Sequence, residues 1–149
     1  MKIGFIGLGN VGGKLAGSLL RNQFDVTVND LNKNLLHDFE TKGAKIIFSP
    51  KELAENVDLI ITCLPSPKIC SEVMEGKNGV IEGLSKNKIW LEMSTTDEAE
   101  VKRLGKIISK KKQFHLMVLL VAVVIEQPLE ILLFLLEEKG MLLKRFCQF

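Results

Sequence analysis

Short apolar runs alternate with stretches of helical periodicity along the first 112 residues of the chain. The run that ends at Cys63 is apolar at nearly every central position, which suits a strand buried on both faces of a parallel sheet. The predicted strands are residues 2–6, 25–29, 44–48, 57–63 and 88–92. The predicted helices are residues 11–21, 31–42, 50–56 and 68–75, and a last one from 97 to about 110–112. This alternation predicts right-handed crossovers and an α/β fold with a doubly wound parallel sheet.

Turn and cap residues set several of these boundaries. Ser49 stands directly before Pro50, and this pair predicts the capped start of a helix. Gly76, Gly79 and Gly83 are interpreted as loop and turn points between the fourth helix and the fifth strand.

A glycine-rich segment follows the first predicted strand and opens the first predicted helix. It reads Gly7-Leu8-Gly9-Asn10-Val11-Gly12 and has the spacing G-x-G-x-x-G. Gly7 allows a tight turn, Gly9 lets a pyrophosphate approach the main chain, and Gly12 lets the helix pack closely on the strand. The helix then directs free N–H groups and its positive dipole end at the phosphates. This context predicts a Rossmann-type dinucleotide-binding unit; the alternative is that the glycines serve turn geometry alone.

Asp30 stands at the end of the second predicted strand, where its carboxylate can accept hydrogen bonds from the adenosine ribose hydroxyls. A 2′-phosphate at that place would face the carboxylate. The next residue is Leu31, not an arginine that could pair with phosphate. The sequence therefore favours NAD over NADP.

Composition and charge narrow the class of protein. The chain has 149 residues, 46% hydrophobic and 26% charged, which is typical of one globular domain. Its net charge of +2 gives no indication of a nucleic-acid partner. Cys63, Cys70 and Cys147 form an odd set without a C-x-x-C pair, so no metal site is assigned and a reducing, cytoplasmic location is expected.

Three segments, taken in order, resemble the β-hydroxyacid dehydrogenases, which include 3-hydroxyisobutyrate dehydrogenase and the related cofactor domain of 6-phosphogluconate dehydrogenase. They are residues 4–12, Leu64-Pro65 after the fourth predicted strand, and Ser94-Thr95 after the fifth. The resemblance covers about residues 1–112. It implies that Leu64, Pro65 and Thr95 line the nicotinamide side of the cofactor. From the residues alone, Pro65 could instead be a turn residue and Thr95 a helix cap.

The predicted cofactor-binding residues combine both lines of reasoning. They are Gly7, Leu8, Gly9, Asn10, Val11, Gly12, Asp30, Leu31, Leu64, Pro65 and Thr95. The family usually has methionine where Val11 stands, which is a mild change at a position that contacts the cofactor through its backbone.

The resemblance also implies hydride transfer between NAD or NADP and a small 3-hydroxyacid or its semialdehyde. In that family a lysine on a later helix acts as general acid and base, and a helical second domain supplies much of the substrate pocket. Neither is identified in this sequence, so no catalytic residue is assigned and the helical domain is expected to be absent. A 3-hydroxyacid is expected as a partner only if a catalytic half is supplied. The alternatives are a non-catalytic dinucleotide-binding module and a remnant without function.

Residues 113–149 form a hydrophobic tail that departs from the family pattern. An apolar run at 116–125 precedes a Pro-containing break, and the family's Ser-Gly-Gly segment is missing. One hypothesis is a frameshift in the gene near residues 113–120, because another reading frame of permitted codons gives a family-like sequence. The rival hypothesis is a selected segment: an extra strand from 116 to about 124 with a helix, a dimerisation element or a membrane hairpin. The run is too short to span a bilayer, so a membrane partner is not expected.

Overall fold

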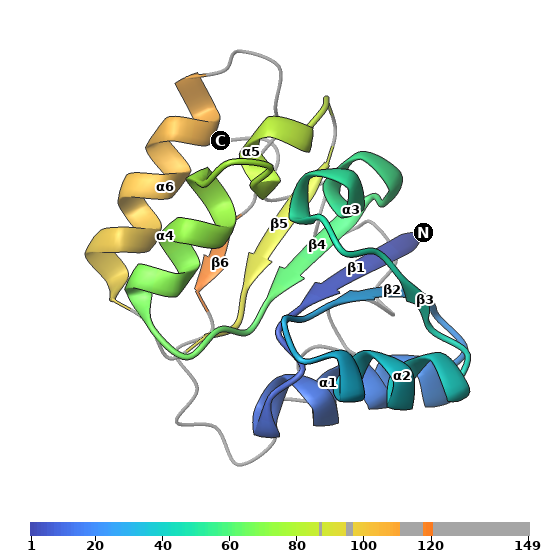
Figure 1. Cartoon of the computed structure of the whole chain (residues 1–149). Coiled ribbons are helices and arrows are strands. Elements are labelled where there is room, and N and C mark those ends of the chain that lie inside the picture. The colour runs from blue at the N-terminus through green and yellow to red at the C-terminus, as the bar shows by residue number, and fades with distance from the viewer. Residues whose placement is uncertain (87, 95–96, 111–117, 121–149) are drawn as a thin grey trace.

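Six parallel strands form one sheet in residues 1–86, 88–94, 97–110 and 118–120, which are the residues described by this computed structural model (Figure 1). The strands are β1 (Lys2–Ile6), β2 (Asp25–Asn29), β3 (Lys45–Ile46), β4 (Leu59–Thr62), β5 (Ile89–Glu92) and β6 (Val118–Leu120). The helices are α1 (Asn10–Arg21), α2 (Lys33–Thr41), α3 (Pro50–Asn56), α4 (Pro67–Glu75), α5 (Val80–Gly83) and α6 (Glu98–Lys110). The predicted doubly wound parallel sheet is confirmed.

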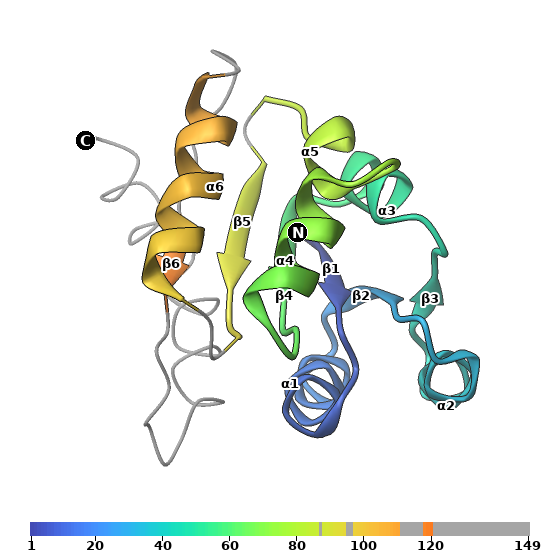
Figure 2. The same ribbon diagram turned by 60° about the vertical axis from the view of Figure 1, so that its left-hand side comes forward.

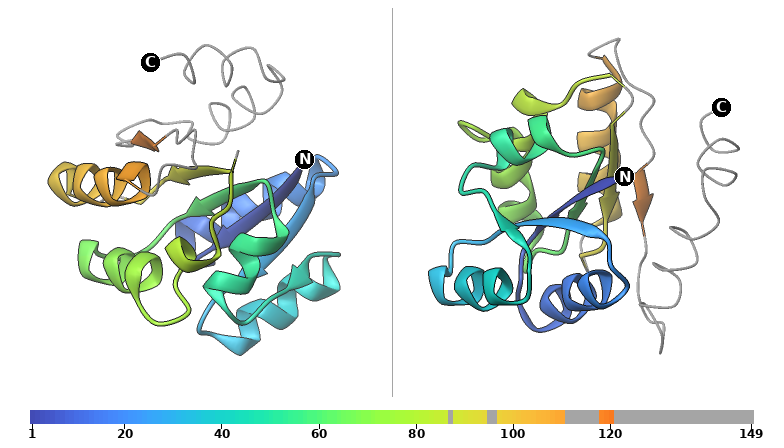
Figure 3. Two further views of the ribbon diagram at one scale, coloured as in Figure 1. Left: turned by 90° about the horizontal axis from the view of Figure 1, so that it is seen from above. Right: turned by 90° about the vertical axis from the view of Figure 1, so that its right-hand side faces the viewer.

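The strand order is β3-β2-β1-β4-β5-β6, so the chain begins at the centre of the sheet. It first winds toward one edge and then, from β4 onward, toward the other; Figures 2 and 3 show β3 and β6 at these opposite edges. Ligands of open α/β sheets bind at the carboxyl ends of the strands, where the winding reverses. In this chain the reversal lies between β1 and β4.

The carboxyl ends of four strands form one row across the sheet. Ile6 of β1 is opposite Asn29 of β2 on one side and Thr62 of β4 on the other, and Thr62 is opposite Glu92 of β5. Because the register is so regular, the loops that follow these four strands all leave the sheet at the same level. The residues of these loops are therefore brought close together.

Each face of the sheet has its own hydrophobic core. The side chains of successive strand residues alternate between the faces, as the pleat requires. Phe5 packs with residues of α1 and α2 on one face, and Trp90 packs with residues of α3, α4, α5 and α6 on the other. Figure 1 shows α1 and α2 together beneath the sheet. This two-sided cover explains why the predicted central strands are so uniformly apolar.

Two predicted segments differ most from the structure. The strand predicted over 44–48 is reduced to β3, and Phe48 is largely exposed because the chain turns there toward the cap of α3. The glycine-rich stretch contains the short helix α5, since Val80 and Ile81 are buried in the second core. In both places, packing and capping override the local pattern.

The cap predicted at Ser49 is present, since its hydroxyl accepts a hydrogen bond from the main chain of Glu52 and Pro50 begins α3. β6 lies inside the range where the sequence left an extra strand open. The remaining residues of 113–149, and with them the frameshift and helix hypotheses, lie outside the described residues, and the boundary at residue 112 stays a prediction.

Candidate functional site

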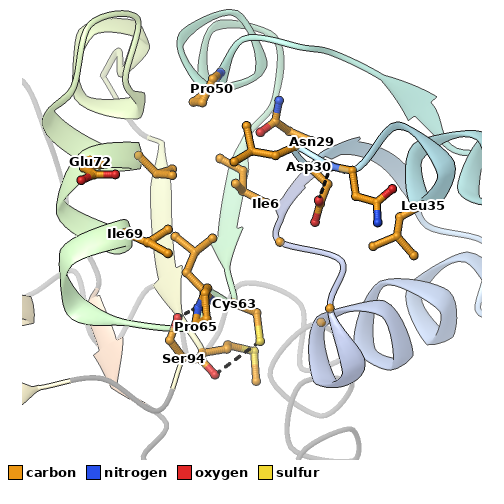
Figure 4. Close-up of a pocket in the computed structure, with 18 of the residues that line it drawn as sticks. Ile6, Asn29, Asp30, Leu35, Pro50, Cys63, Pro65, Ile69, Glu72 and Ser94 are labelled. Atoms are coloured by element: carbon orange, nitrogen blue, oxygen red, sulfur yellow. Dashed lines mark hydrogen bonds between the residues drawn. The ribbon is translucent and has the colours of Figure 1, made fainter.

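A cavity of about 900 Å³ opens at the carboxyl ends of the central strands (Figure 4). Asp30 and Leu35 lie on one side of it, and Ile69 and Glu72 of α4 lie across from them. All the predicted cofactor-binding residues except Leu8 and Thr95 line the cavity: Gly7, Gly9, Asn10, Val11, Gly12, Asp30, Leu31, Leu64 and Pro65. Thr95 lies outside the described residues.

The turn from β1 into α1 depends on two of its glycines. Gly7 has φ +97°, in the left-handed region that other residues rarely adopt, and a Cβ at Gly7 would collide with the main-chain carbonyl of Cys63. A Cβ at Gly12 would collide with the carbonyl of Gly7. These two glycines therefore allow the close contact of α1, β1 and β4 that defines the floor of the cavity.

The N-terminus of α1 faces the cavity without a side-chain cap. Its N-cap residue is Gly9, which has no side chain that could cap the helix. No atom lies within 4 Å of the position that a Cβ at Gly9 would occupy. The N–H groups of a first helical turn have no partner inside the helix and carry the positive end of the helix dipole. This open, electropositive end is suited to an anionic group such as a phosphate.

Asp30 is fixed beside this helix end by two main-chain donors. Leu8 N–H donates to Oδ2 at 2.6 Å, and Asn32 N–H donates to Oδ1 at 2.8 Å. Each carboxylate oxygen keeps capacity for a further donor, such as a hydroxyl. The side chain of Leu8 is buried in the first core, so Leu8 belongs to the site only through this main-chain bond.

Exposed apolar side chains surround the entrance. Among the described residues, the large hydrophobic side chains classed as exposed are Met1, Val11, Leu31 and Phe48, and all but Met1 line the cavity. Leu31 is fully exposed, at 101% of its reference area. Exposed apolar groups clustered at a cavity mark a surface that a ligand covers, and a flat aromatic base is one group of suitable shape.

The loops after β4 and β5 are joined on the other side of the cavity. Leu64 N–H donates to the Ser94 hydroxyl at 2.6 Å, and Cys63 Sγ lies 3.8 Å from the carbonyl oxygen of Met93 (Figure 4). Burial, with a smaller effect of the nearby Glu92 carboxylate, raises the pKa of the Cys63 thiol from 9.0 to about 11. Cys63 is therefore held as a thiol at neutral pH.

Several lining residues were not predicted from the sequence. Ile69 and Val73 are one turn apart on α4, and this spacing after Leu64-Pro65 could have indicated them. Phe48 was placed in a strand, so its exposure at the cavity was missed. Lys77 lies in the loop after α4, where no motif pointed to a ligand.

The charges and metal-binding capacity of the site are limited. The charged lining residues of the described chain are Asp30, Glu72 and Lys77. No group of three His, Cys, Asp or Glu side chains in the described ranges could hold a metal ion. The arrangement can thus hold an elongated ligand with an anionic middle, a hydroxyl-bearing group at Asp30 and a flat apolar end.

Residues 2–118 match the family described as the NAD binding domain of 6-phosphogluconate dehydrogenase. The chain belongs to this family. Its match to mouse mitochondrial 3-hydroxyisobutyrate dehydrogenase is 35% identical over 108 residues, which are 72% of this chain and 32% of the mouse protein. The resemblance to the β-hydroxyacid dehydrogenases is therefore confirmed, and the chain spans about a third of the length of the relatives that it matches.

Solved structures show the same fold. The 3-hydroxyisobutyrate dehydrogenase of Salmonella typhimurium has a TM-score of 0.70 at 21% identity, covering 78% of this chain and 40% of that one. An imine reductase of Myxococcus stipitatus has a TM-score of 0.69 at 14% identity in complex with NADP+, covering 79% and 40%. A variant of it in complex with NAD+ has a TM-score of 0.68 at 14% identity, covering 78% and 39%.

The chain is an NAD(P)-binding domain by family, and structures similar to it hold either dinucleotide. The preference for NAD therefore stays a prediction.

No helix in the described ranges has both the length and the apolar character needed to cross a membrane. The mouse relative is named as mitochondrial, so the cytoplasmic location stays a prediction.

Proposed function

We propose that this chain binds NAD as the cofactor half of an oxidoreductase that transfers a hydride between NAD and a small 3-hydroxyacid or its semialdehyde. One observation carries the proposal: the uncapped N-terminus of α1 and the Asp30 carboxylate face the same cavity of about 900 Å³. A helix end of this kind accepts a diphosphate, and an acid at the end of β2 accepts ribose hydroxyls.

The remaining lining residues have a place in this arrangement. Leu31 and Phe48 offer apolar surface beside Asp30, where the adenine would be covered. Leu64, Pro65 and Ser94 lie in the loops after β4 and β5, on the other side of β1, so they would hold the nicotinamide half. The bound nicotinamide ring supplies the hydride chemistry, and the residues of this chain bind and orient it.

NAD is preferred over NADP in this proposal because Asp30 carries a negative charge at the ribose position. Its carboxylate is held in place by Leu8 and Asn32 N–H groups and so does not turn away from a 2′-phosphate without losing these bonds. A 2′-phosphate would therefore meet repulsion at its own position.

A second candidate is a dinucleotide-binding module without catalysis of its own. This candidate would use the same cavity, whose lining in the described part of the chain includes one lysine, Lys77 in the loop after α4. The two hydrophobic cores, one on each face of the sheet, argue against the third candidate, an unfolded remnant without function.

Isothermal titration of the purified chain with NAD, NADP and AMP tests the proposal. We expect binding of NAD with one site per chain, weaker binding of NADP, and measurable binding of AMP, which carries the adenosine half and one phosphate. A folded chain that binds none of the three would overturn the cofactor function. Equal affinities for NAD and NADP would overturn the preference alone.

A further inference from the structure

Glu92 at the end of β5 is a fully buried carboxylate that the cofactor proposal does not use. Three donors meet its two oxygens. The Thr62 hydroxyl at 2.7 Å and the Cys70 thiol at 3.0 Å donate to Oε2, and Ser94 N–H donates to Oε1 at 2.7 Å. Trp90 Nε1 donates to the same Thr62 hydroxyl at 2.7 Å, which extends the network into the second core.

A carboxylate in this place is costly for stability. No lysine or arginine in the described part of the chain forms an ion pair with Glu92. Removing an acid from water without a cation is unfavourable, and a well-packed apolar residue would avoid that cost. The carboxylate does fix the relative positions of three segments, because its two oxygens accept hydrogen bonds from β4, α4 and the loop after β5 at the same time.

The network continues to the surface of the cavity through Ser94. Its N–H is held by Glu92, and its hydroxyl accepts the N–H of Leu64 at 2.6 Å. Glu92 thus connects the end of β5 to the loop after β4 through two successive hydrogen bonds. Leu64, Pro65 and Ser94 all line the cavity, in loops after strands that lie across β1 from Asp30.

We propose that Glu92 is a positioning residue for the cofactor. It holds Ser94, and through Ser94 the Leu64–Pro65 segment, at the separation that fits the half of the dinucleotide lying away from Asp30. The proposal rests on the proposed function, and it adds that this half of the cavity is set by a buried acid that does not touch the ligand. The affinity for a ligand that fills only the Asp30 half of the cavity should then not depend on Glu92.

The substitution Glu92→Gln tests this directly. An amide has one acceptor oxygen in place of two. If that oxygen faces Thr62 and Cys70, the amide NH2 opposes Ser94 N–H, donor against donor. If it faces Ser94 N–H, the NH2 leaves Thr62 and Cys70 only as acceptors, and the Thr62 hydroxyl already accepts from Trp90 Nε1. We expect the Kd for NAD to rise about tenfold and the Kd for AMP to change less than about twofold, both measured by titration well below the melting temperature. The emission of bound NADH should also shift toward that of the free dinucleotide, since its ring loses its fixed surroundings.

Three further variants separate positioning from stability. Ser94→Ala keeps Glu92 but removes the acceptor of Leu64 N–H, so it should reproduce the selective loss of NAD, and it serves if Glu92→Gln does not fold. Cys70→Ala removes a donor on the far oxygen and should leave both Kd values unchanged. Ile108→Ala, in the second core and outside the cavity lining, should lower the melting temperature and leave both Kd values unchanged.

The outcomes are distinct. If the unsubstituted chain binds neither NAD nor AMP, the proposed function fails. Suppose that it binds both. If Glu92→Gln and Ser94→Ala then weaken the binding of NAD and of AMP equally, or weaken neither, the positioning role of Glu92 is wrong. A higher Kd for NAD with an unchanged Kd for AMP in both variants, and unchanged Kd values in Ile108→Ala, supports it.

Discussion

Asp30 combines two tasks in one side chain. Its carboxylate oxygens hold the main chain of Leu8 and of Asn32, and they face the cavity at the place where a ribose would lie. The first task shapes the turn between β1 and α1, and the second follows from the charge and position of the carboxylate. A substitution at Asp30 therefore changes both the ligand preference and the local order of the turn.

The variant Asp30→Arg should reverse the preference between the dinucleotides. We expect the affinity for NAD to fall by about tenfold, which is about 1.4 kcal/mol, while the affinity for NADP rises because guanidinium pairs with the 2′-phosphate. Asp38→Arg on the exposed face of α2 is the matched control for the change in charge. The same ratio of NAD to NADP affinity in the original chain and in Asp30→Arg would contradict the role of Asp30.

Cys63 should react slowly with alkylating reagents in the folded chain. A thiol pKa of about 11 in place of 9.0 leaves a smaller thiolate fraction at pH 8, by about a factor of one hundred, and the fraction rises as the pH approaches 11. Peptide mapping after iodoacetamide treatment, compared with the chain in urea, measures this for Cys63 separately from the other cysteines. Equal rates in the folded and unfolded chains at pH 8 would contradict it.

At the residue scale, the sequence indicated the glycines and Asp30 because each carries a constraint visible in its spacing. Glu92 carried no such signal. It stands in the predicted strand 88–92 between apolar neighbours, and alternation within five residues does not reveal that an acid is turned into the core. Its side-chain donors, Thr62 and Cys70, come from other elements and meet it only after folding.

At the scale of elements, α1 is the helix on which the site depends. Its first turn has no side-chain cap, although α3 and α4 are capped by Ser49 and Ser66. A glycine N-cap costs a helix only about 0.3 kcal/mol relative to Ser or Asp, so α1 keeps its stability while its first N–H groups stay open for the proposed phosphate. Gly9 and Gly12 contribute to it in different ways.

Alanine substitutions should separate these two contributions. Gly9→Ala meets open space and should cost no more than about 1 kcal/mol of stability, because alanine is a poorer N-cap than glycine. Its Cβ would stand where a phosphate approaches, so the affinity for NAD should fall by at least about tenfold. Gly12→Ala collides with the main chain of Gly7 and should destabilise the fold by about 1–3 kcal/mol. Thermal melts and titrations of both variants measure this. Unchanged NAD affinity in Gly9→Ala would contradict a phosphate at this turn.

The elements themselves were predictable to different degrees. β1, β2 and α1 were placed within a residue because apolar runs, caps and glycines agree there. β3 and α5 were not, because the first is limited by the turn to Ser49 and the second is induced by burial of Val80 and Ile81. Local pattern failed where tertiary contacts decide the conformation.

At the scale of the whole molecule, the chain has the sheet and the cavity of a dinucleotide-binding domain. It belongs to a family of NAD-binding domains, and it spans 32% of the mouse relative. The sheet, its reversal between β1 and β4, and the cavity at that reversal are all in the described residues. The topology brings the ends of β1, β2, β4 and β5 together, which is why the site could be anticipated from the alternation of strands and helices and from the motifs.

The most direct test of the central claim is a crystal structure of the chain grown with a saturating concentration of NAD. We expect the diphosphate against the N–H groups that open α1, the adenosine ribose hydroxyls on the Asp30 carboxylate, and the nicotinamide half beside Pro65 and Ser94. A folded chain whose crystals show this turn without the dinucleotide, or show NAD bound elsewhere, would contradict the claim.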